Sequence, residues 1–142
     1  MRTVNDALIG LEYETAHARK SAWQAQMAAE QARYYAREAT DQRATSMDRQ
    51  SAASSAHSQY LHSQPHAAAA AEAAQRAANY YSRIRPSEPG SDRAPELLAR
   101  AKEAAHTARQ AVLSAARSAD YAAEECMHTW QPAMNAHDPA DE

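Results

Sequence analysis

The sequence predicts an all-α protein, and three observations lead to this prediction. Alanine, the residue with the highest helix propensity, occupies 38 of the 142 positions. Glycine, which weakens helices, occurs only twice. Small or apolar residues recur at alternating intervals of three and four over two long stretches, which is the spacing of a heptad seam. We therefore expect an elongated antiparallel bundle of three long alanine-rich helices.

The composition also predicts a thin core. The chain contains six Leu, two Ile, two Val and no Phe, and its length fits one domain, expected at residues 1–130. A side chain of one methyl group buries little area, so such a core contributes little to the free energy of folding. We therefore expect a homo-oligomer or a protein partner to add to the stability of the bundle.

Charge, hydropathy and cysteine content limit the partners and the compartment that we expect. The net charge of −3 gives no electrostatic footprint for nucleic acid. No apolar run approaches the length of a membrane span, and residues 1–10 do not resemble a signal peptide. The single Cys126 rules out an internal disulfide and fits a reducing compartment. We expect a cytoplasmic protein that binds neither nucleic acid nor membrane.

The first helix is expected to begin at Thr3 and to carry two apolar stripes. The first is a seam of Val4, Leu8, Leu11, Thr15, Ala18, Ala22, Ala25, Ala29, Ala32, Ala36 and Ala39. The second, on roughly the opposite side, consists of Ile9, Tyr13, Ala16, Trp23, Met27 and Tyr34. A helix that is apolar on two sides is either central in its bundle or uses one side as an oligomer or partner surface.

The middle of the chain leaves the number of helices open. A turn is expected between Asp41 and Ser46, with Thr45 or Ser46 capping the next helix. Pro65 either kinks one long middle helix or divides it, which would make four helices. Because matching lengths favour three rods, we expect a kink.

The third helix is expected to follow a clear loop, "RPSEPGSDRAP", and to begin near Ala94 or Pro95. Its seam is Ala94, Leu98, Ala101, Ala105, Ala108, Val112, Ala115, Ala119, Ala122, Cys126 and Thr129. Residues 131–142 are predicted to form a short, disordered acidic tail.

Two similar segments, "ARYYAR" and "ANYYSR", contain the pairs Tyr34–Tyr35 and Tyr80–Tyr81. In a three-helix bundle the two pairs would lie at opposite ends, whereas four helices could bring them together. Tyr34 and Tyr35 lie off their alanine seam, but Tyr80 lies on the seam of its helix. The two pairs therefore face differently, and we do not expect them to share a site.

Three Glu-x-x-His pairs have the spacing that ferritin-like bundles use for metal ligands: Glu14/His17, Glu103/His106 and Glu125/His128. All six residues lie off the seams, so we expect them to be solvated neighbours rather than ligands. His62 and His66 are separated by Pro65, which distorts their spacing. We expect no metal and no cofactor.

The stretch "AHARKSA", residues 16–22, resembles the motif of histidine phosphotransfer bundles over seven residues. The resemblance implies that His17 would carry the phosphoryl group, with Lys20 three residues later. Arg19 stands where that family has an apolar residue, and Ser21 stands where it has glycine. Without this resemblance, we would expect His17 and Lys20 to be two solvated residues on one face of the helix.

We predict a non-enzymatic helical interaction protein with no catalytic residues. It is expected to homo-oligomerise or bind a protein partner through apolar helix faces. The residues expected to make these contacts are Trp23, Met27, Tyr34, Tyr35, Tyr80 and Tyr81. The alternative is a bundle-type enzyme, or a histidine phosphotransfer or metal-binding module, that uses His17.

Overall fold

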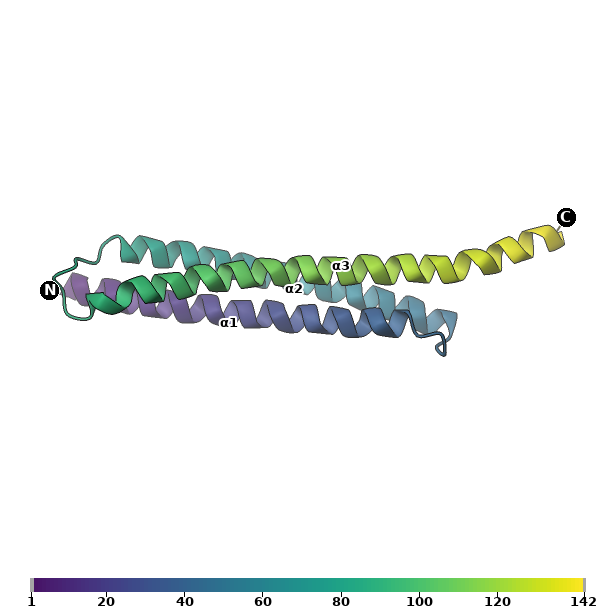
Figure 1. Ribbon diagram of the computed structural model, residues 1–142, viewed down its shortest axis with the longest axis horizontal. Helices are drawn as coiled ribbons and strands as arrows, with labels where there is room; N and C mark the ends of the chain where they lie inside the picture. Colours follow the sequence, from purple (N-terminus) through teal and green to yellow (C-terminus); the bar gives the residue numbers. More distant parts are fainter. Residues whose placement is uncertain (1, 142) are drawn as a thin grey trace. The chain divides into compact units, whose positions relative to one another are not determined.

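The computed structural model describes the backbone of residues 2–141 and the side chains of residues 6–126. Its elements are α1 (Arg2–Ala39), α2 (Ser46–Tyr81), the short 3₁₀ helix η1 (Ser91–Arg93) and α3 (Ala94–Asp141) (Figure 1). The described backbone contains helices and no strand, which confirms the all-α prediction. The predicted tail, residues 131–142, lies outside the described side chains and stays a prediction.

The turn between α1 and α2 lies where the sequence predicts it. The Thr45 hydroxyl accepts a hydrogen bond from the backbone N–H of Asp48 at 3.1 Å, which caps α2. Arg49, which is buried, donates from Nε to the carbonyl of Asp41 at 2.8 Å. These contacts hold the chain reversal although no glycine or proline is present.

Pro65 lies inside α2 and does not divide it, so the described chain has three long helices rather than four. A proline has no N–H to donate, so the carbonyl of Leu61, four residues earlier, loses its usual helical partner. The helix nevertheless continues on both sides of this position.

A glycine ends the loop that leads to α3. Gly90 has φ of 84°, a left-handed conformation that residues with a Cβ rarely adopt. A Cβ at this position would also lie 2.9 Å from Leu8 Cδ2. η1 follows, and α3 begins at Ala94 with Pro95 in its first turn, where a missing N–H costs nothing.

The chain forms two compact units, each of which contains parts of the three long helices. Unit 1 consists of Met1–Gln26 and Ser63–Val112, and unit 2 consists of Met27–His62 and Leu113–Glu142. The prediction of a single domain at residues 1–130 stays a prediction.

Contacts in unit 1 establish the direction of its helices. Arg76 on α2 binds Glu14 on α1, and the Tyr80 ring lies against Gly10, so α1 and α2 run in opposite directions. The Thr15 hydroxyl donates to the carbonyl of Leu97 at 3.1 Å. Leu8 lies beside Gly90, in the loop that leads to α3. From Leu8 to Thr15, the residues that α1 contacts rise in number from Gly90 to Leu97, so α1 and the start of α3 run in the same direction.

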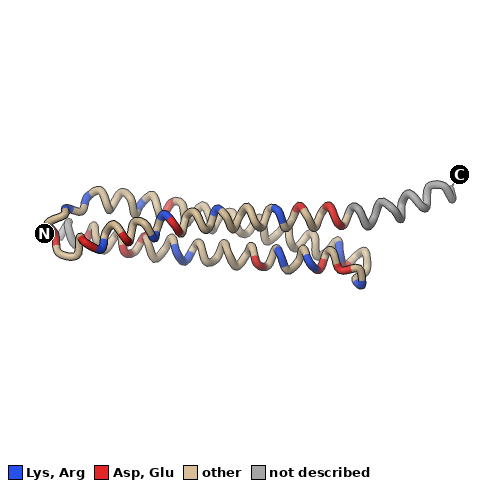
Figure 2. Tube along the Cα trace, viewed as in Figure 1, with Lys and Arg blue, Asp and Glu red and all other residues tan. Residues whose placement is uncertain are grey.

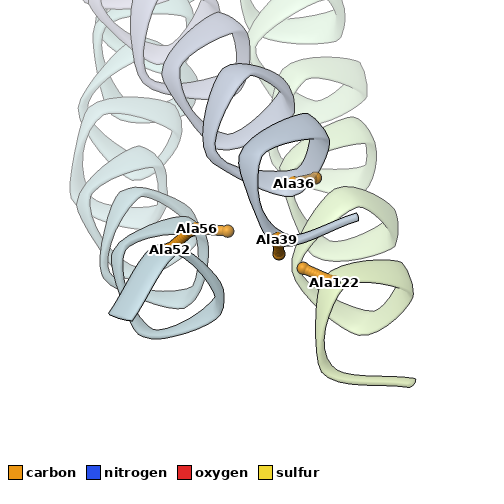
Figure 3. Packing of buried hydrophobic residues seen from close by; sticks show 5 residues of the cluster. All are labelled: Ala36, Ala39, Ala52, Ala56 and Ala122. Atoms are coloured by element: carbon orange, nitrogen blue, oxygen red, sulfur yellow. The ribbon is translucent and has the colours of Figure 1, made fainter. Parts of the chain in front are cut away.

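Alanines from three helices form the core of unit 2. Figure 3 shows Ala36 and Ala39 of α1, Ala52 and Ala56 of α2, and Ala122 of α3. The cluster is buried, and the partly buried ring of Tyr35 packs against it. Small side chains allow helix axes to come close together. The space between the helices is therefore narrow, and alanine methyl groups fill it.

The predicted seam of α1 is buried from Leu11 to Ala39. A further buried row, which the predicted seam does not include, lies beside it and repeats every seven residues: Ala7, Glu14, Ser21 and Ala28. Because α1 packs against two neighbouring helices, its buried stripe is wider than a single seam.

Charges of both signs lie along all three helices (Figure 2). Within the described part of the chain, no helix has the length and apolarity that crossing a membrane requires.

Candidate interaction surface

The second stripe of α1 lies on the outside of the helix. Ile9, Tyr13 and Trp23 are 61%, 67% and 60% exposed, and Met27 and Tyr34 are also exposed. The interpretation in which α1 buries both of its apolar sides is therefore wrong. We call these five residues the outer face of α1. Ala16, also exposed, lies between Tyr13 and Trp23.

Two ring contacts order parts of this face. Tyr13 and the half-exposed His17 stack with their rings 5° from parallel and 6.3 Å between centroids. The rings of Tyr34 and Tyr35 form a T-shaped pair, with 76° between their planes and 5.4 Å between centroids. An aromatic ring that is already held in place loses less conformational entropy when a partner covers it.

Trp23 also borders an open groove between α1 and α3 in unit 1. Its volume is about 700 Å³, and its lining comprises Arg19, Lys20, Ala22, Trp23, Gln26, Arg100, Glu103, Ala104 and Thr107. Arg100 is held by Glu96 at 2.7 Å. Among the described residues, Arg19 and Lys20 form no ion pair, so the side of the groove that α1 contributes is positively charged.

The six predicted contact residues are divided between the two units. Trp23, Tyr80 and Tyr81 belong to unit 1, whereas Met27, Tyr34 and Tyr35 belong to unit 2.

Two of the tyrosines make contacts inside their own unit. Tyr35 packs against the alanine cluster. Tyr80 lies against Gly10, and the Arg83 guanidinium lies 5.6 Å from the centre of its ring. The involvement of both tyrosines in partner binding stays a prediction.

The expectation that Glu14 is solvated is wrong. Glu14 is only 6% exposed, and its Oε2 accepts a hydrogen bond from Arg76 Nε at 3.0 Å. Its other oxygen is buried and makes no hydrogen bond. Glu14 therefore faces α2, while His17 stacks on Tyr13, so the two residues do not act as a pair of ligands. The seven-residue row that includes Ala7 and Ser21 is the signal that could have placed Glu14 inside.

The other Glu-x-x-His pairs are less informative. Glu103 and His106 are exposed on α3, in line with the expectation of solvated neighbours, and His128 lies outside the described side chains. In the part of the chain with described side chains, no group of three or more His, Cys, Asp or Glu residues could hold a metal ion.

A second open groove, in unit 2, was not identified from the sequence. Its volume is about 410 Å³, and it is lined by Arg33, Ala36, Arg37 and Thr40 of the α1 side and by Arg117, Ser118 and Tyr121 of α3. Its basic residues come from two helices, so no single stretch of sequence contains the cluster.

Comparison of the chain with protein-family models, with curated proteins and with solved structures finds no match.

Proposed function

We propose that this chain is a non-enzymatic helical interaction protein that associates through the outer face of α1. One observation carries the proposal: five large apolar or aromatic side chains are exposed in a row on one helix. Aromatic side chains such as Trp23 supply much of the binding energy of interfaces when they are desolvated. These large side chains do not take part in the alanine core, which supports a role in contacts with another molecule.

We further propose that the partner is a second copy of α1 lying antiparallel to the first. Together with Ala16, Lys20 and Glu30, the five residues of the face occupy eight positions at alternating intervals of three and four along one helix. The antiparallel register places Ile9 opposite Tyr34, Tyr13 opposite Glu30, Ala16 opposite Met27, and Lys20 opposite Trp23, and symmetry repeats each pair.

Each pair in this register is complementary. The small Ala16 leaves room for Met27, and the Lys20 ammonium can lie over the Trp23 ring as a cation–π pair. The hydroxyl of Tyr13 can donate a hydrogen bond to the Glu30 carboxylate. A twofold interface is self-complementary in this way, because every contact occurs twice with the roles exchanged.

Other arrangements of the same two helices are less favourable. A parallel pair would place Lys20 against Lys20 and Glu30 against Glu30, which costs electrostatic energy twice. An antiparallel pair shifted by one heptad leaves either Ile9 and Tyr13 or Glu30 and Tyr34 without a partner position. Among the antiparallel registers, only the proposed one uses all eight positions.

Cysteine cross-linking tests the orientation directly. In a Cys126→Ser background, Ala16→Cys and Met27→Cys chains are prepared separately, mixed and oxidised, and covalent dimers are measured. In the proposed register residues 16 and 27 are opposite each other, so the mixture cross-links. Residue 16 lies about 16 Å along the axis from its own counterpart, beyond the roughly 7 Å Cα separation of a disulfide. Neither variant alone should therefore cross-link.

The opposite pattern would refute the orientation. In a parallel pair each variant cross-links with itself and the mixture gives no additional dimer. Met47→Cys, on the exposed start of α2, provides the control for random collision when mixed with Ala16→Cys.

Sedimentation tests the association itself. Trp23→Ala is expected to weaken self-association while the helical circular dichroism signal is unchanged. Met47→Ala removes a similarly exposed apolar side chain away from α1 and should leave association as in the wild type. Equal association in the wild type and Trp23→Ala, or a wild type that stays monomeric, would overturn the proposed function.

A further inference from the structure

The groove in unit 2 is a concentration of positive charge without a counterion from its lining. Arg33 and Arg37 come from α1, and Arg117 comes from α3 across the groove. No acidic residue is found among the described residues that line it. Among the described side chains, none of the three arginines takes part in an ion pair. Like charges that line the same groove repel one another, so an anion between them would be stabilised.

The remaining lining residues limit the chemistry of that anion. Ser118 provides a hydroxyl, whereas the Thr40 hydroxyl already donates to the carbonyl of Arg37 at 2.9 Å. Arg117 makes a long contact, 3.4 Å from its Nε to the carbonyl of Leu113, and no contact among the described residues uses its terminal nitrogens. Tyr121 is 54% exposed and presents a ring at the edge of the groove.

We propose that this groove binds a small phosphorylated molecule. The planar guanidinium group forms paired hydrogen bonds with phosphate oxygens, and several arginines suit a diphosphate better than a single carboxylate. A volume of about 410 Å³ is in the range of small-molecule sites. The Tyr121 ring would stack on a flat group attached to the phosphate, as in a nucleoside diphosphate. None of the residues that line this groove belongs to the outer face of α1, and the site does not depend on the proposed association.

Calorimetric titration with pyrophosphate and with adenosine diphosphate tests the proposal on the full chain. Both probes are expected to bind, and Arg37→Gln or Arg117→Gln is expected to weaken binding by about tenfold or more. Arg109→Gln is the matched control, because it removes the same charge from an exposed position of α3 outside the groove. Its affinity should equal that of the wild type.

A further variant separates the phosphate from the flat group. Tyr121→Leu should weaken binding of adenosine diphosphate and leave pyrophosphate binding unchanged if the ring stacks on the base. An equal loss for both probes would overturn the assignment of Tyr121. Failure of both probes to bind the wild type, or equal weakening by Arg109→Gln and Arg37→Gln, would overturn the site.

Discussion

Replacing Gly10 by alanine tests how closely α1 and α2 approach in unit 1. A Cβ atom on Gly10 would lie 2.5 Å from Cε1 and 2.6 Å from Cζ of Tyr80. These separations are far below van der Waals contact, so either the tyrosine ring moves or the two helix segments separate. The other effect of the substitution is favourable, because alanine is the better helix former.

The two effects have comparable magnitudes and opposite signs. Alanine in place of glycine inside a helix stabilises by about 1 kcal/mol. Adding a methyl group to a filled site costs roughly 1–3 kcal/mol. The free energy of unfolding of Gly10→Ala should therefore fall by about 0–2 kcal/mol in the wild-type background. In a Tyr80→Ala background the ring is absent, and the same substitution should raise it by about 1 kcal/mol.

Denaturant unfolding followed by circular dichroism measures the four members of this double-mutant cycle. The expected coupling between positions 10 and 80 is about 1–3 kcal/mol. Tyr81→Ala is the control background, because residue 81 is the neighbouring tyrosine and the three atoms nearest to a Cβ at position 10 all belong to Tyr80. If Gly10→Ala stabilises the protein equally in the wild-type, Tyr80→Ala and Tyr81→Ala backgrounds, the close approach is refuted.

Three further outcomes follow from the described contacts, and a fourth follows from the proposed dimer. Arg76→Ala leaves the buried Glu14 carboxylate unpaired and should cost about 1–3 kcal/mol, more than Glu14→Gln, as measured by urea unfolding. Thr45→Ala removes the cap of α2 and should cost about 1 kcal/mol in the same assay; no change would show that the cap is dispensable. Ala56→Leu overfills the alanine cluster and should cost roughly 1–3 kcal/mol, whereas a gain would reveal empty space there. The melting temperature of the wild type should rise with protein concentration, and that of Trp23→Ala should rise less; equal slopes would contradict the proposed dimer.

Much of the fold could be predicted because the sequence alternates so regularly. The seam of α1 from Leu11 to Ala39 is buried. α2 begins at Ser46, directly after the expected turn, and α3 begins at Ala94, where the sequence predicts a start near Ala94 or Pro95. These features depend on local rules: helix propensity, caps and heptad spacing. Pro65 shows the limit of such rules, because whether a proline ends a helix depends on what packs around it.

Features that depend on a second helix could not be predicted. Glu14 lies off the predicted seam, and only the presence of two neighbouring helices explains its burial beside Arg76. The contact of Gly10 with Tyr80 joins residues 70 positions apart, and no spacing rule connects them. The grooves are of the same kind, since each combines side chains of α1 with side chains of α3.

The two Tyr-Tyr segments show how the same residues acquire different roles. The Tyr80 ring occupies the space that a side chain at position 10 would take, and Tyr35 packs on the alanine cluster. Both tyrosines therefore contribute to the packing of their own unit. Tyr34 and Trp23 are exposed because a core of alanines has no space for rings of that size. A bundle with so little apolar volume inside gains most from an interface that buries the large side chains outside. The chain has few Leu, Ile, Val and Phe residues for its core, and the large side chains of the row on α1 are exposed. The proposed association through α1 would bury the large side chains that the alanine core does not contain.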